Sequence, residues 1–430
     1  MDYVPRTRRR IKPVVLIPVI VAVLAIGLVA FNQLTKKQVT GKKALTICDM
    51  SVEKTTDELS ETYKQTYQTS DYLFYGDSLD FFKNKYDAEK SDNIYGKTII
   101  LKDVCSDEQY SFLVENNVDR GILLNKLNSG FYRVYVMEDL IKKRMTYTET
   151  LNAVIHTNNA NREEMKVTIM ADKNLGSTAA DKNYVFIKVE ASKLAKKAYD
   201  IALDPAGNDS DLTYTVSKGS EGNGLVEATE SYQACLKLKK ALEDNGFKVL
   251  IVRDKNEEID SYGKSGRLAR AYKAKARYYF HIGFSENSNK NYSGFEISYS
   301  AHSSKILASQ IVYTVDKKTP LAAGIYYSGE DKAGLIPATL VEGKDGRSVY
   351  DNVLWVREAG GLATQAGMYS DNAESSNGSF AKNNRYGMNG LNISIGYLTN
   401  NDDATAWKNH SDEICKQISN AISAYLHPGD

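Results

Sequence analysis

The chain has 430 residues, of which 42% are hydrophobic and 25% charged. This length suggests two or three domains, and the composition is that of ordinary globular protein rather than of a disordered chain or a polytopic membrane protein. Because 55 lysines and arginines balance 54 aspartates and glutamates, the basic excess typical of nucleic-acid-binding proteins is missing. We therefore expect no nucleic-acid partner.

An uncharged apolar run of 18 residues, 14–31, lies near the N-terminus. A helix needs roughly 20 residues to cross a bilayer. Five basic residues precede the run and only Lys36 and Lys37 follow it closely, so the positive-inside rule predicts a cytoplasmic tail at 1–13. A cleaved signal peptide is the alternative. Since no small-x-small cleavage site follows, we expect an uncleaved, single-pass transmembrane anchor in the cell membrane, with the bulk of the chain extracellular.

Short runs of β-branched and aromatic residues follow one another between residues 38 and 192. Such runs, separated by turn residues, are typical of strands. Examples are TIILKDV, FYRVYVM, AVIHT, KVTIMAD and YVFIKVE. We expect a β-rich, antiparallel extracytoplasmic domain here, and its role as a binding module or a spacer stays open.

The pattern changes at about residue 199. Strand-like segments, DIALD, FKVLIVRD and RYYFHIGF, now alternate with amphipathic stretches at Glu227–Glu243 and Arg267–Ala276. Alternation of strands and helices favours a mainly parallel sheet flanked by helices. The sequence therefore predicts an α/β domain over residues 199–430.

The order of segments in this domain resembles that of a known enzyme family. From Ile201 to Tyr425 the chain reads, in turn, ALEDNGFKVLIVRD, RLARAYKAKARYYFHIGF, SGFEISYS, SSKILASQI and IGYLTN. This order is similar to the zinc-dependent N-acetylmuramoyl-L-alanine amidases (amidase type 3 catalytic domain), which cut the bond between N-acetylmuramic acid and L-alanine. The resemblance implies an amidase-like fold and, as partner, peptidoglycan or a cell-wall protein.

The same resemblance implies that most of the family's metal site is lost. In the family two histidines and a glutamate hold zinc, and a second glutamate acts as general base. Here Gly207 and Gly283 stand in place of the histidines, Ser394 stands in place of the general base, and Glu227 matches the glutamate ligand. A catalytic zinc needs about three protein ligands and one open position. We therefore expect a pseudoenzyme with no cofactor.

Two other interpretations stay open. An active amidase could use a rearranged zinc site built from Glu227, His281 and Glu342, in which case zinc would be its cofactor. His281 lies two residues before Gly283, about 6 to 7 Å away along a strand, so we favour a core or surface histidine. The other interpretation is a structural or adhesion scaffold.

The segment from Trp355 to Gly390 is rich in glycine, serine and asparagine. A stretch of this length is either a surface excursion or a binding loop. Five side chains in it are suited to gripping a sugar, a carboxylate or a peptide backbone: Arg357, Glu358, Tyr369, Arg385 and Tyr386.

The four cysteines, Cys48, Cys105, Cys235 and Cys415, form no CxxC pair. This spacing argues against a zinc ribbon or a redox motif. Buried thiols are one interpretation. Pairing of Cys48 with Cys105, or of Cys235 with Cys415, is the other, since disulfides persist outside the membrane.

Overall fold

The computed structural model describes residues 65–85, 94, 96–106, 108–114, 121–159, 163–172, 182–192, 199–210, 216–261, 265–299, 305–324, 333–337, 340–342, 348–351 and 385–426. Contacts between α-carbons divide the chain into two units, Met1–Thr46 and Ile47–Asp430, and all of the described residues belong to the second. None of the helices in these ranges is long and apolar enough to cross a membrane. The predicted anchor at 14–31 lies outside the described residues.

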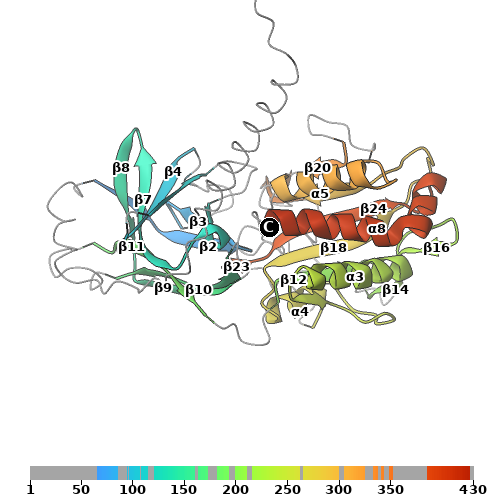
Figure 1. The fold of residues 1–430 in the computed structure, drawn as a ribbon, viewed down its shortest axis with the longest axis horizontal. Helices are drawn as coiled ribbons and strands as arrows, with labels where there is room; N and C mark the ends of the chain where they lie inside the picture. The colour runs from blue at the N-terminus through green and yellow to red at the C-terminus, as the bar shows by residue number, and fades with distance from the viewer. Residues whose placement is uncertain are drawn as a thin grey trace, which may run out of the picture. The chain divides into compact units, whose positions relative to one another are not determined.

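The N-terminal part is built on an eight-stranded sheet (Figure 1). Its central path runs β1-β8-β7-β11-β10-β9, and β4 joins it by pairing with β7 and β5. The strands are β1 (Thr66–Thr69), β4 (Thr98–Asp103), β5 (Gln109–Leu113), β7 (Gly130–Glu138), β8 (Ile141–Tyr147), β9 (Leu151–Asn158), β10 (Glu164–Ala171) and β11 (Val185–Ala191). All of the pairings are antiparallel except that of β1 with β8. The predicted β-rich region is therefore confirmed.

A smaller sheet in the order β23-β2-β3-β6 joins distant parts of the sequence. It comprises β2 (Asp71–Tyr75), β3 (Ser78–Phe82), β6 (Ile122–Leu123), which a 3-10 turn at Leu124–Lys126 follows, and β23 (Tyr386–Gly387). β23 pairs in parallel with β2. Residues just before the last strand of the chain therefore belong to a sheet whose other strands come from the N-terminal part.

The C-terminal part holds a six-stranded sheet in the order β17-β12-β18-β24-β19-β20. Its strands are β12 (Ile201–Pro205), β17 (Val249–Ile251), β18 (Tyr278–Ser285), β19 (Glu296–Tyr299), β20 (Leu335–Pro337) and β24 (Asn389–Tyr397). The first four strands in this order are parallel, whereas β19 runs against β24 and β20 runs with β19. The predicted α/β domain is confirmed, with a sheet that is mixed at one edge.

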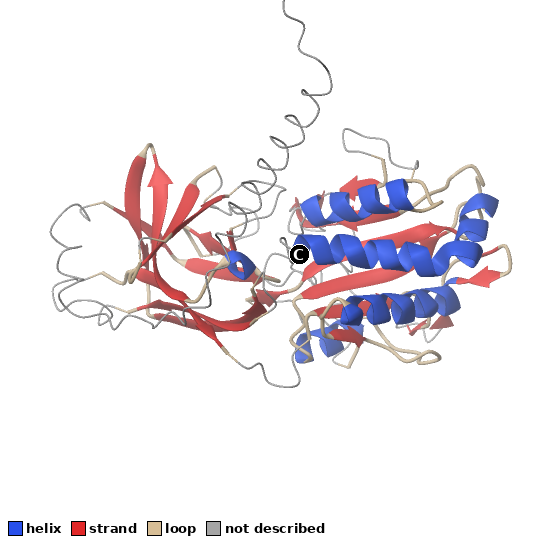
Figure 2. Cartoon of the chain, viewed as in Figure 1, coloured by secondary structure: helices blue, strands red, loops and turns tan. Residues whose placement is uncertain are grey.

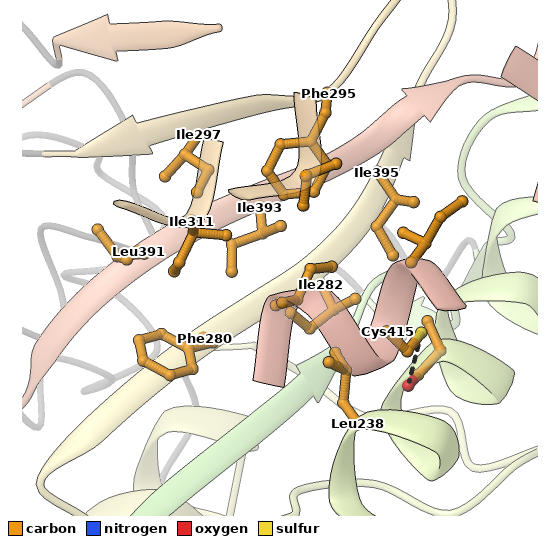
Figure 3. Packing of buried hydrophobic residues seen from close by; sticks show 14 of the residues in the cluster. Leu238, Phe280, Ile282, Phe295, Ile297, Ile311, Leu391, Ile393, Ile395 and Cys415 are labelled. Carbon is orange, nitrogen blue, oxygen red and sulfur yellow. Dashed lines mark hydrogen bonds between the residues drawn. The ribbon is translucent and has the colours of Figure 1, made fainter. Parts of the chain in front are cut away.

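Three helices lie side by side on one face of this sheet (Figure 2): α3 (Glu227–Asp244), α5 (Lys305–Lys318) and α8 (Asn401–Leu426). Their apolar side chains pack with alternate residues of the strands, such as Phe280 and Ile282 of β18 (Figure 3). Leu268 and Ala271 of the short helix α4 (Arg267–Lys273) pack instead with Tyr279, whose side chain points to the opposite face. Because strand side chains alternate between faces, His281 and Gly283 share that second face with Tyr279.

Further described strands form three two-stranded antiparallel sheets. They are β13 (Asp209–Ser210) with β14 (Val216–Ser217), β15 (Glu221–Gly222) with β16 (Leu225–Val226), and β21 (Leu340–Glu342) with β22 (Ser348–Asp351).

Two of the cysteines are buried free thiols on neighbouring helices. Cys235 lies on α3 and Cys415 on α8, and neither is in a disulfide. Cys105 is disulfide-bonded, and Cys48 lies outside the described residues. The thiol interpretation therefore holds for Cys235 and Cys415.

Candidate functional site

Glu227 is the first residue of α3 and is buried. The backbone N–H of Phe284 donates a hydrogen bond to its Oε1 at 2.7 Å, and the N–H of Ser220 donates to its Oε2 at 2.8 Å. Both carboxylate oxygens are thus engaged by the main chain. Burial raises the pKa of Glu227 overall, although these N–H groups and the nearby His281 act to lower it. The sequence did not predict these two hydrogen bonds. Every residue except proline has a backbone N–H group, so the residue type does not indicate which of them donates to Glu227.

Gly283 lies directly against this carboxylate. A Cβ atom on Gly283 would lie 2.6 Å from Oε1 of Glu227 and 3.0 Å from Cβ of Ala206. Real Cβ atoms do not approach other atoms to within 3.0 Å, so one of these groups would have to move. Positions 227 and 283 therefore converge in space, and the glutamate fills the volume that a side chain at 283 would enter.

Gly207 follows β12 and takes a left-handed backbone conformation, with φ of +76°. A Cβ atom there would lie 2.6 Å from Cβ of Ala228 and 2.7 Å from the carbonyl oxygen of Lys218. Residues other than glycine rarely take such a φ. A histidine could therefore replace Gly207 only if the main chain of the turn changed its conformation.

Ser394 lies beside Gly283 in the paired strands β18 and β24. Its hydroxyl oxygen is 2.8 Å from that of Ser285. A neutral serine hydroxyl does not take up a proton at neutral pH as a carboxylate can. The residue opposite Ser394 on β19 is the buried Glu296, whose Oε2 accepts a hydrogen bond of 2.9 Å from the Tyr397 hydroxyl. Sequence reasoning did not single out Glu296, although a glutamate between the apolar Phe295 and Ile297 was the signal for it.

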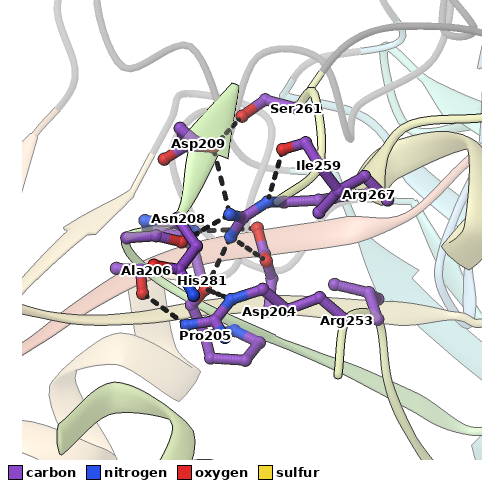
Figure 4. A network of polar contacts seen from close by, with 12 residues as sticks. Asp204, Pro205, Ala206, Asn208, Asp209, Arg253, Ile259, Ser261, Arg267 and His281 are labelled. Carbon is purple, nitrogen blue, oxygen red and sulfur yellow. Dashed lines mark hydrogen bonds and ion pairs between the residues drawn. The ribbon is translucent and has the colours of Figure 1, made fainter. Parts of the chain in front are cut away.

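A second buried cluster surrounds Asp204 (Figure 4). Its Oδ1 lies 3.0 Å from a guanidinium nitrogen of Arg267, and its Oδ2 lies 2.9 Å from Nδ1 of His281 and accepts a hydrogen bond from the Tyr279 hydroxyl. Burial acts to raise the pKa of Asp204, but Arg267 and His281 outweigh it and bring the pKa to about 2. Asp204 is therefore ionised. His281 is buried, and its Nδ1 contacts this carboxylate.

Two buried arginines hold the turn that contains Gly207. Arg267 donates to the carbonyl oxygens of Pro205 and Gly207, each at 2.5 Å. Arg253 donates to the carbonyl oxygens of Pro205 at 2.9 Å and Ala206 at 2.8 Å (Figure 4). Charge-assisted bonds of this kind are stronger than neutral ones. The turn is thereby held in the conformation that only glycine takes readily at 207. Sequence reasoning assigned no role to either arginine.

Two of the predicted ligand-binding residues, Arg385 and Tyr386, belong to the part of the chain that the structure describes, and neither lies at this site. Arg385 forms an ion pair with Asp71 and donates to the carbonyl oxygen of Tyr72 at 3.2 Å. The ring of Tyr386 stacks on Phe74 with 5.3 Å between the ring centres. Both precede β24, whereas Ser394 lies eight residues beyond Tyr386, roughly 26 Å along an extended strand. Arg357, Glu358 and Tyr369 lie outside the described residues.

The structure describes the side chains of two residues of the alternative zinc site, Glu227 and His281. Nδ1 of His281 lies 2.9 Å from Oδ2 of Asp204. The main chain of Glu342 ends β21, which pairs with β22 in a separate two-stranded sheet. In the ranges that the structure describes, three or more His, Cys, Asp or Glu side chains nowhere gather in a way that could hold a metal ion.

Comparison of the chain with known protein families confirms the resemblance that the order of its C-terminal segments indicated. A sequence model of the family described as N-acetylmuramoyl-L-alanine amidase matches residues 201–424. No curated protein sequence gives a significant match.

Several solved structures are similar to the chain at low identity. The N-acetylmuramoyl-L-alanine amidase AmiC2 of Nostoc punctiforme matches 54% of this chain and 99% of its own, with 14% identity and a TM-score of 0.35. The catalytic domain of CwlV, an N-acetylmuramoyl-L-alanine amidase from Bacillus (Paenibacillus) polymyxa var. colistinus, matches 53% of this chain and 98% of its own, with 17% identity and a TM-score of 0.35. The N-acetylmuramyl-L-alanine amidase Ami1 from Mycobacterium smegmatis matches 55% of this chain and 100% of its own, with 16% identity and a TM-score of 0.35.

The family match spans more than half of the chain and covers the whole six-stranded sheet and its helices, except for the last two residues of α8. The chain therefore belongs to the N-acetylmuramoyl-L-alanine amidase family.

Proposed function

We propose that this protein is a membrane-anchored member of the family at the cell surface, and that its amidase-like domain binds peptidoglycan or a cell-wall protein without hydrolysing it. One observation carries the proposal. Both oxygens of Glu227 accept backbone hydrogen bonds, and the space beside them that a ligand side chain at 283 would need is filled by the glutamate itself.

The family's zinc does not fit the side chains at these positions. Zinc in such enzymes supplies a bound water of lowered pKa as the nucleophile, and it needs about three protein ligands. Of the three positions that correspond to zinc ligands, 207, 227 and 283, Glu227 alone has a side chain that can bind a metal, because the other two are glycines. Ser394 offers a hydroxyl where a general base is required. No hydrolytic step follows from this set of residues.

Binding has a suitable place at the carboxyl ends of the parallel strands, where open α/β sheets hold their ligands. An open pocket of about 500 Å³ lies there, lined by Glu286, Asn287 and Ser288 after β18 and by Thr399 after β24. Its lining residues are polar, and the Asn287 N–H donates to the Thr399 hydroxyl at 3.0 Å. Such a lining suits the hydroxyls and amides of a glycan strand or its stem peptide.

The position of the anchor is part of this proposal. The apolar run at 14–31 and the basic residues before it support a single-pass helix with the amidase-like domain outside. Peptidoglycan is then within reach of the domain. A working amidase with a rearranged site gains no support, since among the described residues no group of three or more His, Cys, Asp or Glu side chains could hold a metal ion and Glu227 with His281 would supply only two ligands.

Co-sedimentation of the full-length, detergent-solubilised protein with purified sacculi tests the proposal. We expect the wild type to sediment with sacculi. Ser288→Trp, which fills the pocket, should weaken binding at least tenfold, whereas the matched control Ser288→Ala should bind as the wild type does. Wild-type protein that stays in the supernatant would exclude peptidoglycan as the ligand, and equal binding by Ser288→Trp would exclude this pocket.

A further inference from the structure

Large apolar side chains are exposed at one end of the eight-stranded sheet. Leu140 is 95% exposed, Ile141 43% and Leu113 51%. Leu140 and Ile141 lie at the tip of the β7–β8 hairpin, and Leu113 is the last residue of β5. Thr98 pairs with Leu113 on one side and with Met137 on the other, so Leu113 lies at the same end of the sheet as the hairpin tip.

The backbone at this tip is strained. Glu138 pairs with Ile141, so Asp139 and Leu140 form a two-residue loop, and their φ angles are +51° and +63°. Loops with positive φ at both positions favour asparagine, aspartate and glycine, and a leucine is disfavoured there. Since almost the whole Leu140 side chain is exposed, packing within the fold does not offset this cost. An exposed leucine in a strained position is the kind of outlier from which a functional role is inferred.

Three lysines and two acidic residues, Glu138 and Asp139, flank the apolar tip. The Lys142 ammonium lies 4.2 Å from the centre of the Tyr135 ring. Lys143 and Lys97 share one carboxylate, that of Glu138, at 2.5 Å and 3.3 Å. Apolar side chains flanked by lysines are typical of segments that lie in the interface of a bilayer with anionic lipids.

The chain from the expected anchor reaches the sheet at this same end. β1 begins at Thr66, which pairs in parallel with Arg144, three residues from Ile141. The Arg144 N–H donates to the carbonyl oxygen of Gln65 at 3.4 Å. Residues 32–64 separate the expected anchor from this point. The chain therefore enters the sheet at the end that carries the hairpin tip.

We propose that the Leu140–Ile141 tip, together with Leu113, inserts into the outer surface of the membrane that carries the anchor. The inference rests on the proposed anchoring but not on the loss of catalysis. In a chain anchored in the same bilayer, the tip meets the lipid in an intramolecular contact, so a small apolar area is enough for insertion. The ligand is the bilayer itself. The apolar side chains carry the contact, because Lys97 and Lys143 are already paired with Glu138.

Fluorescence quenching in vesicles tests this with the full chain. The protein is placed in vesicles of phosphatidylglycerol and phosphatidylcholine, with an environment-sensitive dye on Leu140→Cys and, as matched control, on Tyr313→Cys, which is 66% exposed on α5. We expect spin-labelled lipids to quench the dye at 140 at least threefold more strongly than the dye at 313. Equal quenching at both positions would overturn the proposal. So would self-quenching at 140 that grows with the protein-to-lipid ratio, since the tip would then meet a second copy of the chain.

A second variant separates a membrane role from a merely structural one. Leu140→Gly relieves the strained φ, so we expect a higher unfolding midpoint in detergent. With the dye on Leu113→Cys, the same substitution should remove at least half of the quenching by lipid. A higher midpoint with unchanged quenching would contradict the proposal. A wash of the vesicles with alkaline carbonate tests the anchor alone. Release of the protein would show that it has no membrane anchor. Retention of the protein without quenching of the dye would show that the anchor is present and that the hairpin tip stays in water.

Discussion

The Glu227 carboxylate and Gly283 share one space, because a Cβ atom on Gly283 would lie 2.6 Å from Oε1 of Glu227. The same Oε1 accepts the N–H of the next residue, Phe284. Two positions at which the resemblance implies metal ligands thus meet here, and Glu227 is bonded to the main chain of the residue after Gly283. The arrangement satisfies the buried glutamate without a metal.

Substitution of both residues should show this coupling. Gly283→Ala is expected to cost about 1 to 3 kcal/mol of unfolding free energy, since the added methyl group displaces the carboxylate. Glu227→Ala is expected to cost about 1 to 3 kcal/mol, since it leaves buried N–H groups unpaired. In the double variant the methyl group no longer meets a carboxylate, so the combined loss should fall short of the sum by about 1 kcal/mol or more. Urea unfolding of the four proteins measures this, and strictly additive losses would contradict the shared space.

The turn at Gly207 should reject any side chain. A methyl group at Gly207 would meet Ala228 at 2.6 Å, whereas one at Gly224, which has a similar φ of +74°, would find nothing within 4 Å. Gly224→Ala therefore carries only the backbone cost of a left-handed residue, about 1 to 2 kcal/mol. We expect Gly207→Ala to lose about 1 to 3 kcal/mol more than this control. Thermal unfolding of the pair is the measurement, and equal losses would show that the turn has room for a ligand side chain.

Asp204 should make the fold sensitive to acid. Its pKa in the folded protein is about 2 against an ordinary 3.8. A lowered pKa adds stability that is present above the unfolded value and is lost as pH falls through the folded value, here about 2 kcal/mol in all. The difference in unfolding free energy between the wild type and Asp204→Asn should therefore shrink by about 2 kcal/mol from about pH 5 to about pH 2. A difference that stays constant over this range would contradict the ionised, buried state of Asp204.

The elements of the α/β domain could be predicted because their signals are local. The segments RYYFHIGF and DIALD are strands at the expected positions, and the predicted Glu227 helix begins at that residue. The convergence of Glu227 with Gly283 followed only from the family resemblance, since the two positions lie 56 residues apart in the sequence. Their contact depends on how α3 packs against β18.

Other features had no local signal. The pairing of β23 with β2 joins Tyr386 to Phe74 across most of the chain, and a two-residue strand carries too little pattern to be recognised. Arg385 was predicted as a ligand-binding residue from its type and its place in a glycine-rich segment. The structure pairs it with Asp71, a carboxylate that sequence reasoning had not considered.

Thiol counting tests the proposed location outside the membrane. Cys105 is disulfide-bonded, whereas Cys235 and Cys415 are free, and burial raises the pKa of both of these thiols. Disulfides persist in oxidising compartments. Protein isolated without reductant should react with a thiol reagent at Cys235 and Cys415 only after unfolding, and peptide mapping should find Cys105 linked to Cys48. Reaction of all four cysteines in the unreduced, unfolded protein would argue against an exported domain.

The loss of hydrolysis is the central claim, and one assay addresses it directly. The full-length protein, the Glu227→Ala variant and an active amidase as positive control are incubated with muropeptides in buffer with added zinc, and the released peptides and the protein-bound zinc are measured together. We predict that the wild type releases no more peptide than Glu227→Ala and holds no stoichiometric zinc. Stoichiometric zinc together with peptide release that Glu227→Ala abolishes would contradict the account.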